Sequence, residues 1–168
     1  TLNMMLHSIG DFERISDHAV NIMRSAKEMH EKELSFSKKA VEELAIYTQA
    51  VREIVDMSFD VFINEDITKA SFVEPLEEVI DYLRTELKQR HVKRLQKGKC
   101  TIEMGFVLSD ITTSYERISD HCSNIAVCLT QVKDDGYDTH EYLDDIKNIN
   151  NEDFKLKYKE FKKKYILP

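Results

Sequence analysis

Glycine, proline and tryptophan are scarce in this sequence of 168 residues, which has four glycines, two prolines and no tryptophan. Folds built from many tight turns need more glycine and proline, so a β-sandwich or β-barrel is disfavoured. Apolar runs are short, and none approaches the roughly 20 residues of a membrane-spanning helix. The first residues also lack the basic start and apolar centre of a signal peptide. These absences predict no direct membrane insertion by this part of the chain.

Cysteine and positive charge are limited as well. The three cysteines form no Cys-x-x-Cys pair, which argues against a disulfide framework and against a thiolate zinc site. The cytoplasm is therefore the expected compartment. A formal net charge of −7 disfavours a nucleic-acid-binding surface. Neither a phosphate-cradling glycine loop nor a Ser/His/Asp arrangement is visible, which favours a protein that is not an enzyme.

What the sequence does contain is helical periodicity. Apolar residues make up 42% of the chain and charged residues 33%, a balance that suits amphipathic helices with a narrow apolar stripe. Steps of three and four between apolar residues predict five helices. Their expected ranges are about 2–29, a second helix ending near 63, then 67–96, 101–132 and 151–165. Helices of this length predict an all-α fold, specifically an elongated antiparallel helical bundle.

Five residues mark expected helix boundaries. Ser35 or Ser37 can cap the second helix, and Asp66 can cap the third. Pro75 either kinks the third helix or marks its true first turn. Gly98 suits a left-handed stop after that helix.

Two further glycines, Gly10 and Gly105, fall inside predicted helices. Each costs roughly 1 kcal/mol relative to alanine at such a position. Either the cost is simply tolerated, or the missing side chain permits close approach of a neighbouring helix. The sequence leaves both interpretations open.

The hexamer ERISDH occurs twice, within FERISDHAVNI at Phe12–Ile22 and within YERISDHCSNI at Tyr115–Ile125, 103 positions apart. A match of six consecutive residues indicates internal duplication, and duplication predicts two structurally equivalent helices. Each copy places a glutamate and an aspartate four positions apart: Glu13 with Asp17, and Glu116 with Asp120.

Carboxylates four positions apart share one face of a helix, where like charges repel. Either the arginine after each glutamate neutralises them, or a hard cation binds between the oxygen ligands. A third pair, Glu77 and Asp81, lies on the helix before the second copy. Antiparallel packing would place this pair opposite Glu116 and Asp120. The four carboxylates would then form a cage that is strongly repulsive without a cation.

Other polar residues carry weaker signals. Asp56 and Asp60 are also four apart, and we interpret them as solvated or structural. His18 and His121 each follow an aspartate, about 100° further around the helix, and are expected as packing groups more than as metal ligands. The basic run Lys88–Lys99 is either a solvated helix end or a docking patch for an acidic partner.

On these residues the sequence resembles the PhoU family of phosphate-uptake regulators. The family signature has the form (D/N)-L-E-R-I-x-D-H-x-x-N-I, and both copies of the duplicated segment are similar to it. The segment Glu86–Ile111 looks like the version of the family found in proteins related to Na/phosphate cotransporters. Tyr137–Leu143 and Phe161–Pro168 together resemble the end of those transporters. The resemblance runs through nearly the whole chain. It implies the cytosolic C-terminal domain of such a transporter-related protein.

The resemblance also implies a domain organisation of two three-helix bundles related by pseudo-symmetry. Residues 1–33 would be the last helix of a truncated first repeat, 34–133 a complete second three-helix repeat, and 134–168 a linker with a short C-terminal helix. The implied cofactor is one or more metal ions, as a multinuclear cluster, with iron, zinc and manganese as candidates. The residues that match the family's metal motifs are Glu77, Asp81, Glu116 and Asp120 in the complete repeat, and Glu13 and Asp17 in the truncated one.

The implied partner is a membrane transporter domain or a phosphate-signalling protein. A missing N-terminal part would then tether the domain to the inner membrane. The apolar face of helix 2–29 must be covered by the C-terminal helix, by a second chain as in a homodimer, or by a missing segment.

Three functions therefore compete. A regulatory metal-binding domain associated with phosphate uptake is the preferred interpretation, and a metal-free helical interaction module is the alternative. A di-metal carboxylate enzyme would need Glu-x-x-His on paired helices, and no histidine in this sequence has an acidic residue three positions before it. The metal content of the protein separates the first two functions.

Overall fold

A computed structural model describes residues 2–133 and 152–168, with side chains described for 6–131 and 152–168. Six helices and no strand occur in these ranges, so the prediction of an all-α antiparallel bundle is confirmed. The expected linker after residue 133 lies outside the described residues up to 151. The helices are α1 (Leu2–Glu31), α2 (Lys38–Asn64), α3 (Ile67–Ala70), α4 (Val73–Gln96), α5 (Ile102–Lys133) and α7 (Glu152–Lys164).

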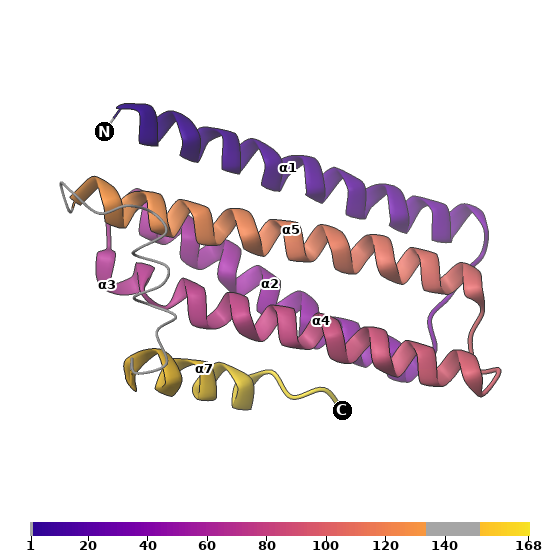
Figure 1. Cartoon of the computed structure of the whole chain (residues 1–168). Coiled ribbons are helices and arrows are strands. Elements are labelled where there is room, and N and C mark those ends of the chain that lie inside the picture. Colours follow the sequence, from indigo (N-terminus) through magenta and orange to yellow (C-terminus); the bar gives the residue numbers. More distant parts are fainter. Residues whose placement is uncertain (1, 134–151) are drawn as a thin grey trace.

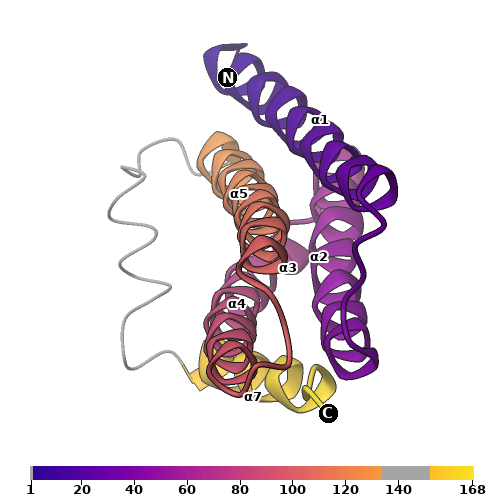
Figure 2. The same cartoon turned by 90° about the vertical axis from the view of Figure 1, so that its right-hand side faces the viewer.

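The helix α5 lies at the centre of the bundle (Figure 1). It packs against α1 on one side and against α2 and α4 on the other. The helix α7 lies on the far side of the bundle from α1, where it packs against α4 (Figure 2). None of the described helices combines the length and the hydrophobicity that crossing a membrane would require.

The core lies where α2, α4 and α5 meet. Tyr47 and Ile54 of α2, Leu76 and Leu83 of α4, and Ile125 of α5 are almost completely buried in one cluster. Burial of an apolar side chain of this size contributes roughly 1.5–3 kcal/mol. The three helices therefore form a stable bundle around this cluster, and the polar residues between α4 and α5 are held in fixed positions.

Most expected helix boundaries are confirmed. The Ser37 hydroxyl caps α2 by accepting a hydrogen bond from the backbone N–H of Ala40, and Asp66 caps α3 in the same way. Gly98 adopts a left-handed conformation with φ 63° after α4 ends. Because glycine has no Cβ, it takes this conformation without steric strain.

The prediction of one continuous helix over residues 67–96 is wrong. The chain forms the short helix α3, leaves the helix at Ser71, and begins α4 at Val73. Pro75 is the third residue of α4, which agrees with the alternative that it marks the true first turn. Proline is tolerated there because the first backbone N–H groups of a helix have no partner within the helix.

The face of α1 that points away from α5 carries exposed apolar side chains. Leu6, Ile9 and Met23 are 57%, 59% and 60% exposed. Because α7 packs against α4, the C-terminal helix does not cover this face. Of the three candidates for covering this face, the C-terminal helix is therefore excluded, and a second chain or a missing segment remains.

Candidate metal site at the seam between α4 and α5

Four acidic residues follow one stripe of α4. Glu74, Glu77, Glu78 and Asp81 are spaced three, four and seven positions from the first, which places them on one side of a helix. The helix α5 packs against α4 and carries Glu116 and Asp120. We call these six carboxylates the acidic seam: Glu74, Glu77, Glu78, Asp81, Glu116 and Asp120.

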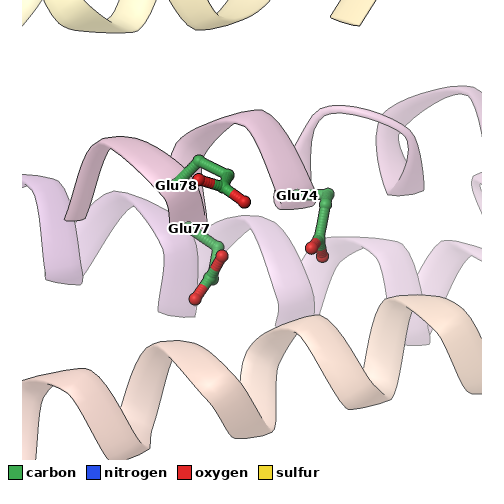
Figure 3. A group of neighbouring side chains, drawn as sticks. All are labelled: Glu74, Glu77 and Glu78. Carbon is green, nitrogen blue, oxygen red and sulfur yellow. The ribbon is translucent and has the colours of Figure 1, made fainter. Parts of the chain in front are cut away.

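Three of these carboxylates gather at the start of α4. One oxygen from each of Glu74, Glu77 and Glu78 lies within 4.8 Å of the other two, and Glu74 and Glu77 are buried. Figure 3 shows Glu74 and Glu77 pointing toward α5. The hydroxyl of Ser123 on α5 donates a hydrogen bond to Glu74. Glu77 is a predicted site residue, whereas Glu74 and Glu78 were not predicted, although their helical spacing was a usable signal.

The middle of the acidic seam holds two aspartates that influence each other. Burial raises the pKa of Asp120, and the charge of Asp81 raises it further while Arg117 lowers it. The Oδ1 atom of Asp81 is buried and has no hydrogen-bond partner among the described residues. Asp81 and Asp120 therefore lie close enough to influence each other. Among the described residues, the carboxylates that gather closely enough to share one ion are Glu74, Glu77 and Glu78, so the expected cage of Glu77, Asp81, Glu116 and Asp120 stays a prediction.

Two arginines neutralise part of this charge. Arg84, one turn after Asp81, forms an ion pair with Glu116 across the two helices. Arg117 lies 3.4 Å from the Oδ2 atom of Asp120. Pairing by Arg117 agrees with the sequence-based expectation. The role of Arg84 was not predicted, because its contact joins residues 32 positions apart. Within the acidic seam, Glu116 and Asp120 thus have arginine partners, whereas the buried Oδ1 atom of Asp81 has no hydrogen-bond partner among the described residues.

The first copy of the duplicated motif does not reach this seam. Glu13 and Asp17 are exposed on α1, which contacts α5 through another face that includes Ile15 and His18. Glu13 and Asp17 therefore lie apart from the acidic seam. Their role as metal ligands stays a prediction.

The two histidines of the duplicated motif meet between α1 and α5. The rings of His18 and His121 stack with centroids 6.0 Å apart. The Nδ1 atom of His121 donates to Asp11 at 2.8 Å, whereas the Nδ1 atom of His18 is buried and unpartnered among the described residues. The second copy has Ser114 where the first has Asp11, which explains the difference. Their position favours the packing role that the sequence analysis expected.

The position of His18 predicts that the protein loses stability in mild acid. Burial lowers the pKa of His18 below its ordinary value of 6.5, and the nearby His121 and Arg117 lower it further. The folded state then binds fewer protons than the unfolded state between the lowered pKa and 6.5. The stability that neutral His18 contributes is therefore complete above pH 6.5, and the free energy of unfolding falls as the pH drops below 6.5. Burial also lowers the pKa of His91, which adds a dependence of the same sign.

Urea unfolding at pH 7.5 and pH 5.5 measures this effect. We expect the wild type to be less stable at pH 5.5 and His18→Gln to lose part of the difference between the two pH values. A packing defect in the variant would lower stability equally at both pH values, so the difference isolates the titration. An undiminished pH dependence in His18→Gln would show that His18 does not contribute.

The donor set of the acidic seam fits a hard metal cation. Carboxylate oxygens are the ligands that such cations prefer in proteins. The buried Asp81 oxygen has no hydrogen-bond partner among the described residues, and a cation would satisfy it. The fold and the seam thus define a class of protein: an all-α bundle in which two antiparallel helices share a row of partly buried carboxylates.

Comparison with known proteins identifies the family. Residues 44–129, half of the chain, match the PhoU domain, and the chain therefore belongs to the PhoU family. It is 27% identical over 115 residues to the phosphate-specific transport system accessory protein PhoU homolog 1 of Thermotoga maritima, an alignment that covers 68% of this chain and 49% of that protein.

A second relative is more distant. The phosphate-specific transport system accessory protein PhoU homolog of Deinococcus radiodurans is 21% identical over 126 residues, which cover 73% of this chain and 56% of that protein. The chain thus spans about half the length of the curated relatives that it matches. No solved structure matches the chain significantly.

Proposed function

We propose that this chain is a non-catalytic regulatory domain of phosphate transport that binds metal at the acidic seam. Membership of the PhoU family supports the link to phosphate transport, since both relatives are named as accessory proteins of phosphate-specific transport systems. Its partner in this proposal is a transporter domain or a phosphate-signalling protein in the cytoplasm. The association with a Na/phosphate cotransporter rests on the resemblance of Glu86–Ile111 and of the C-terminal segments to such proteins.

The single observation that carries the metal proposal is the unpartnered oxygen of Asp81 within the acidic seam. Asp81, Asp120, Glu77 and Glu116 would hold the ion, with Glu74 beside them. The metal would supply a positive partner for the buried Asp81 oxygen. Iron, manganese and zinc are the candidates, because each accepts oxygen ligands.

Metal content after loading tests the proposal. Purified protein is incubated with Mn(II), Fe(II) or Zn(II), desalted and examined by elemental analysis. We expect Asp81→Asn/Asp120→Asn to retain at least about tenfold less metal than the wild type, because two ligand charges are lost while the side-chain volume is kept. The matched control is Asp56→Asn/Asp60→Asn, an aspartate pair of equal spacing on α2, where Asp60 instead pairs with Lys69.

Comparison of metal retention among the double variants shows which carboxylates bind the ion. Equal loss of metal in both double variants would mean that binding follows total charge and not the acidic seam. Loss confined to Glu13→Gln/Asp17→Asn would place the ion on α1 instead. Retention of metal by every variant would remove the acidic seam from the proposal.

The metal-free interaction module is the second candidate, and the Arg84–Glu116 ion pair favours it. Arg84→Gln separates the two functions. If metal binds, loss of the guanidinium should strengthen binding because a competing cation is removed. If the arginines are the natural counter-ions, Arg84→Gln binds no metal and loses stability, since Glu116 is left partly buried without its partner.

A further inference from the structure

A second charged feature lies at the end of the bundle where α2 begins and α4 ends. A pocket of about 490 Å³ opens there, beside the last residue of the chain. Figure 2 shows this end of the bundle toward the viewer, with the C-terminus below the near ends of α2 and α4. We call the pocket at this end of the bundle the cationic pocket. Its positively charged lining residues are Lys39, Arg90, Lys93, Arg94, Lys97 and Lys99.

The charge of this pocket is opposite to that of the molecule. Six cationic side chains line the pocket against one acidic side chain, Glu43, whereas the whole chain carries −7. Arg90 also donates a hydrogen bond to the backbone oxygen of Pro168 at 2.6 Å. Glu43 is fully buried and is bound by Arg90 at 3.1 Å and by Arg94 at 2.7 Å. The four lysines form no ion pair with any residue of the described ranges. Like charges gathered in this way repel one another, and a bound anion would relieve the repulsion.

The backbone adds to the positive potential. The first turn of α2 contains no acidic residue and begins with Lys38 and Lys39, although the start of a helix already carries partial positive charge. The Ser37 hydroxyl accepts from Ala40, so it does not satisfy the backbone N–H groups of Lys38 and Lys39. Unpaired N–H groups at a helix start are suitable donors to phosphate oxygens.

We infer that the cationic pocket binds a soluble anion that carries several phosphate groups. The cations come from three segments: the start of α2, the last turns of α4 and the connection that follows. They are therefore spread around the pocket, and a chain of phosphates can contact more of them than one phosphate can. Buried Glu43 holds Arg90 and Arg94 in place, so the pocket is partly preorganised for oxyanions. Its hollow shape suits a small anion better than a flat membrane surface.

This inference is independent of the acidic seam, and titration calorimetry with sodium tripolyphosphate tests it. Metal-free protein is titrated at low and moderate NaCl. The variant Lys39→Gln/Lys93→Gln/Lys97→Gln alters three exposed side chains, so the fold should be kept. We expect at least about tenfold weaker binding, because charged hydrogen bonds are lost, and weaker binding at higher salt.

A charge-matched variant serves as the control. Lys27→Gln/Arg52→Gln/Lys155→Gln removes three exposed positive charges that lie outside the cationic pocket. It should bind tripolyphosphate about as tightly as the wild type. An equal loss of affinity in both triple variants would overturn the inference, because binding would then reflect net charge alone.

Two further ligands identify the chemistry. Orthophosphate should bind much more weakly than tripolyphosphate, and equal affinities would overturn the requirement for several phosphates. Vesicles that contain phosphatidylglycerol test the membrane as the source of the phosphate groups. Lysine-dependent binding to such vesicles without binding of tripolyphosphate would overturn the inference in favour of a membrane surface.

Discussion

Replacement of Glu43 by alanine should lower the free energy of unfolding by about 3 kcal/mol. Glu43 has no exposed surface and accepts hydrogen bonds from Arg90 and Arg94 of α4. Its removal leaves two guanidinium groups without their carboxylate, and Arg94 is 14% exposed. Breaking a buried pair is costly because the remaining charge is no longer compensated. The contact joins α2 to α4, so the loss should appear as a lower urea midpoint of the whole bundle.

The neighbouring residue provides a matched control. Glu42 is exposed on the same helix, and Glu42→Ala should change stability by less than about 0.5 kcal/mol. Glu43→Gln keeps the volume of the side chain and should be destabilised to an intermediate extent. If Glu43→Ala proves as mild as Glu42→Ala, the buried ion pairs do not hold α2 against α4.

Replacement of Gly105 by leucine should destabilise the bundle by about 2 kcal/mol. A Cβ atom at Gly105 would lie 3.0 Å from the Nε2 atom of His91, a side chain of α4 that is buried. The larger leucine side chain must then displace His91 or separate α4 from α5. Thermal unfolding followed by circular dichroism measures the effect as a lower Tm.

The other helical glycine is the control for this prediction. A Cβ atom at Gly10 would meet nothing within 4 Å. Gly10→Leu should therefore be neutral or stabilising, by up to about 1 kcal/mol, because leucine favours the helix more than glycine does. Equal destabilisation of the two leucine variants would show that helix packing at Gly105 is not the cause.

For Gly10 and Gly105, the sequence alone does not predict whether a neighbouring helix lies close to the glycine. Both lie inside helices, and the sequence leaves tolerated cost and close approach equally open for each. The structure assigns close approach to Gly105 and open space to Gly10. The difference arises from the residue on the neighbouring helix, and local periodicity contains no information about that residue.

The acidic seam shows the same limit in a functional setting. The four-residue spacing placed Glu116 with Asp120, and Glu77 with Asp81, because residues one turn apart share a helix face. Glu74 and Glu78 were not predicted, although their helical spacing is visible in the sequence. The role of Arg84 was not predicted either, because its ion pair with Glu116 depends on the register between α4 and α5. That register follows from the packing of apolar side chains along both helices.

The amino-acid sequence by itself determined the all-α class, most of the helix ends and the duplication, because periodicity, capping residues and a repeated hexamer are local properties. Tertiary structure decided which face of each helix meets another. In the tertiary structure His18 lies against His121, and α7 packs against α4 instead of the apolar face of α1. Cationic residues from separate segments line one pocket. These outcomes depend on contacts between residues far apart in the chain, which form only when the helices pack together.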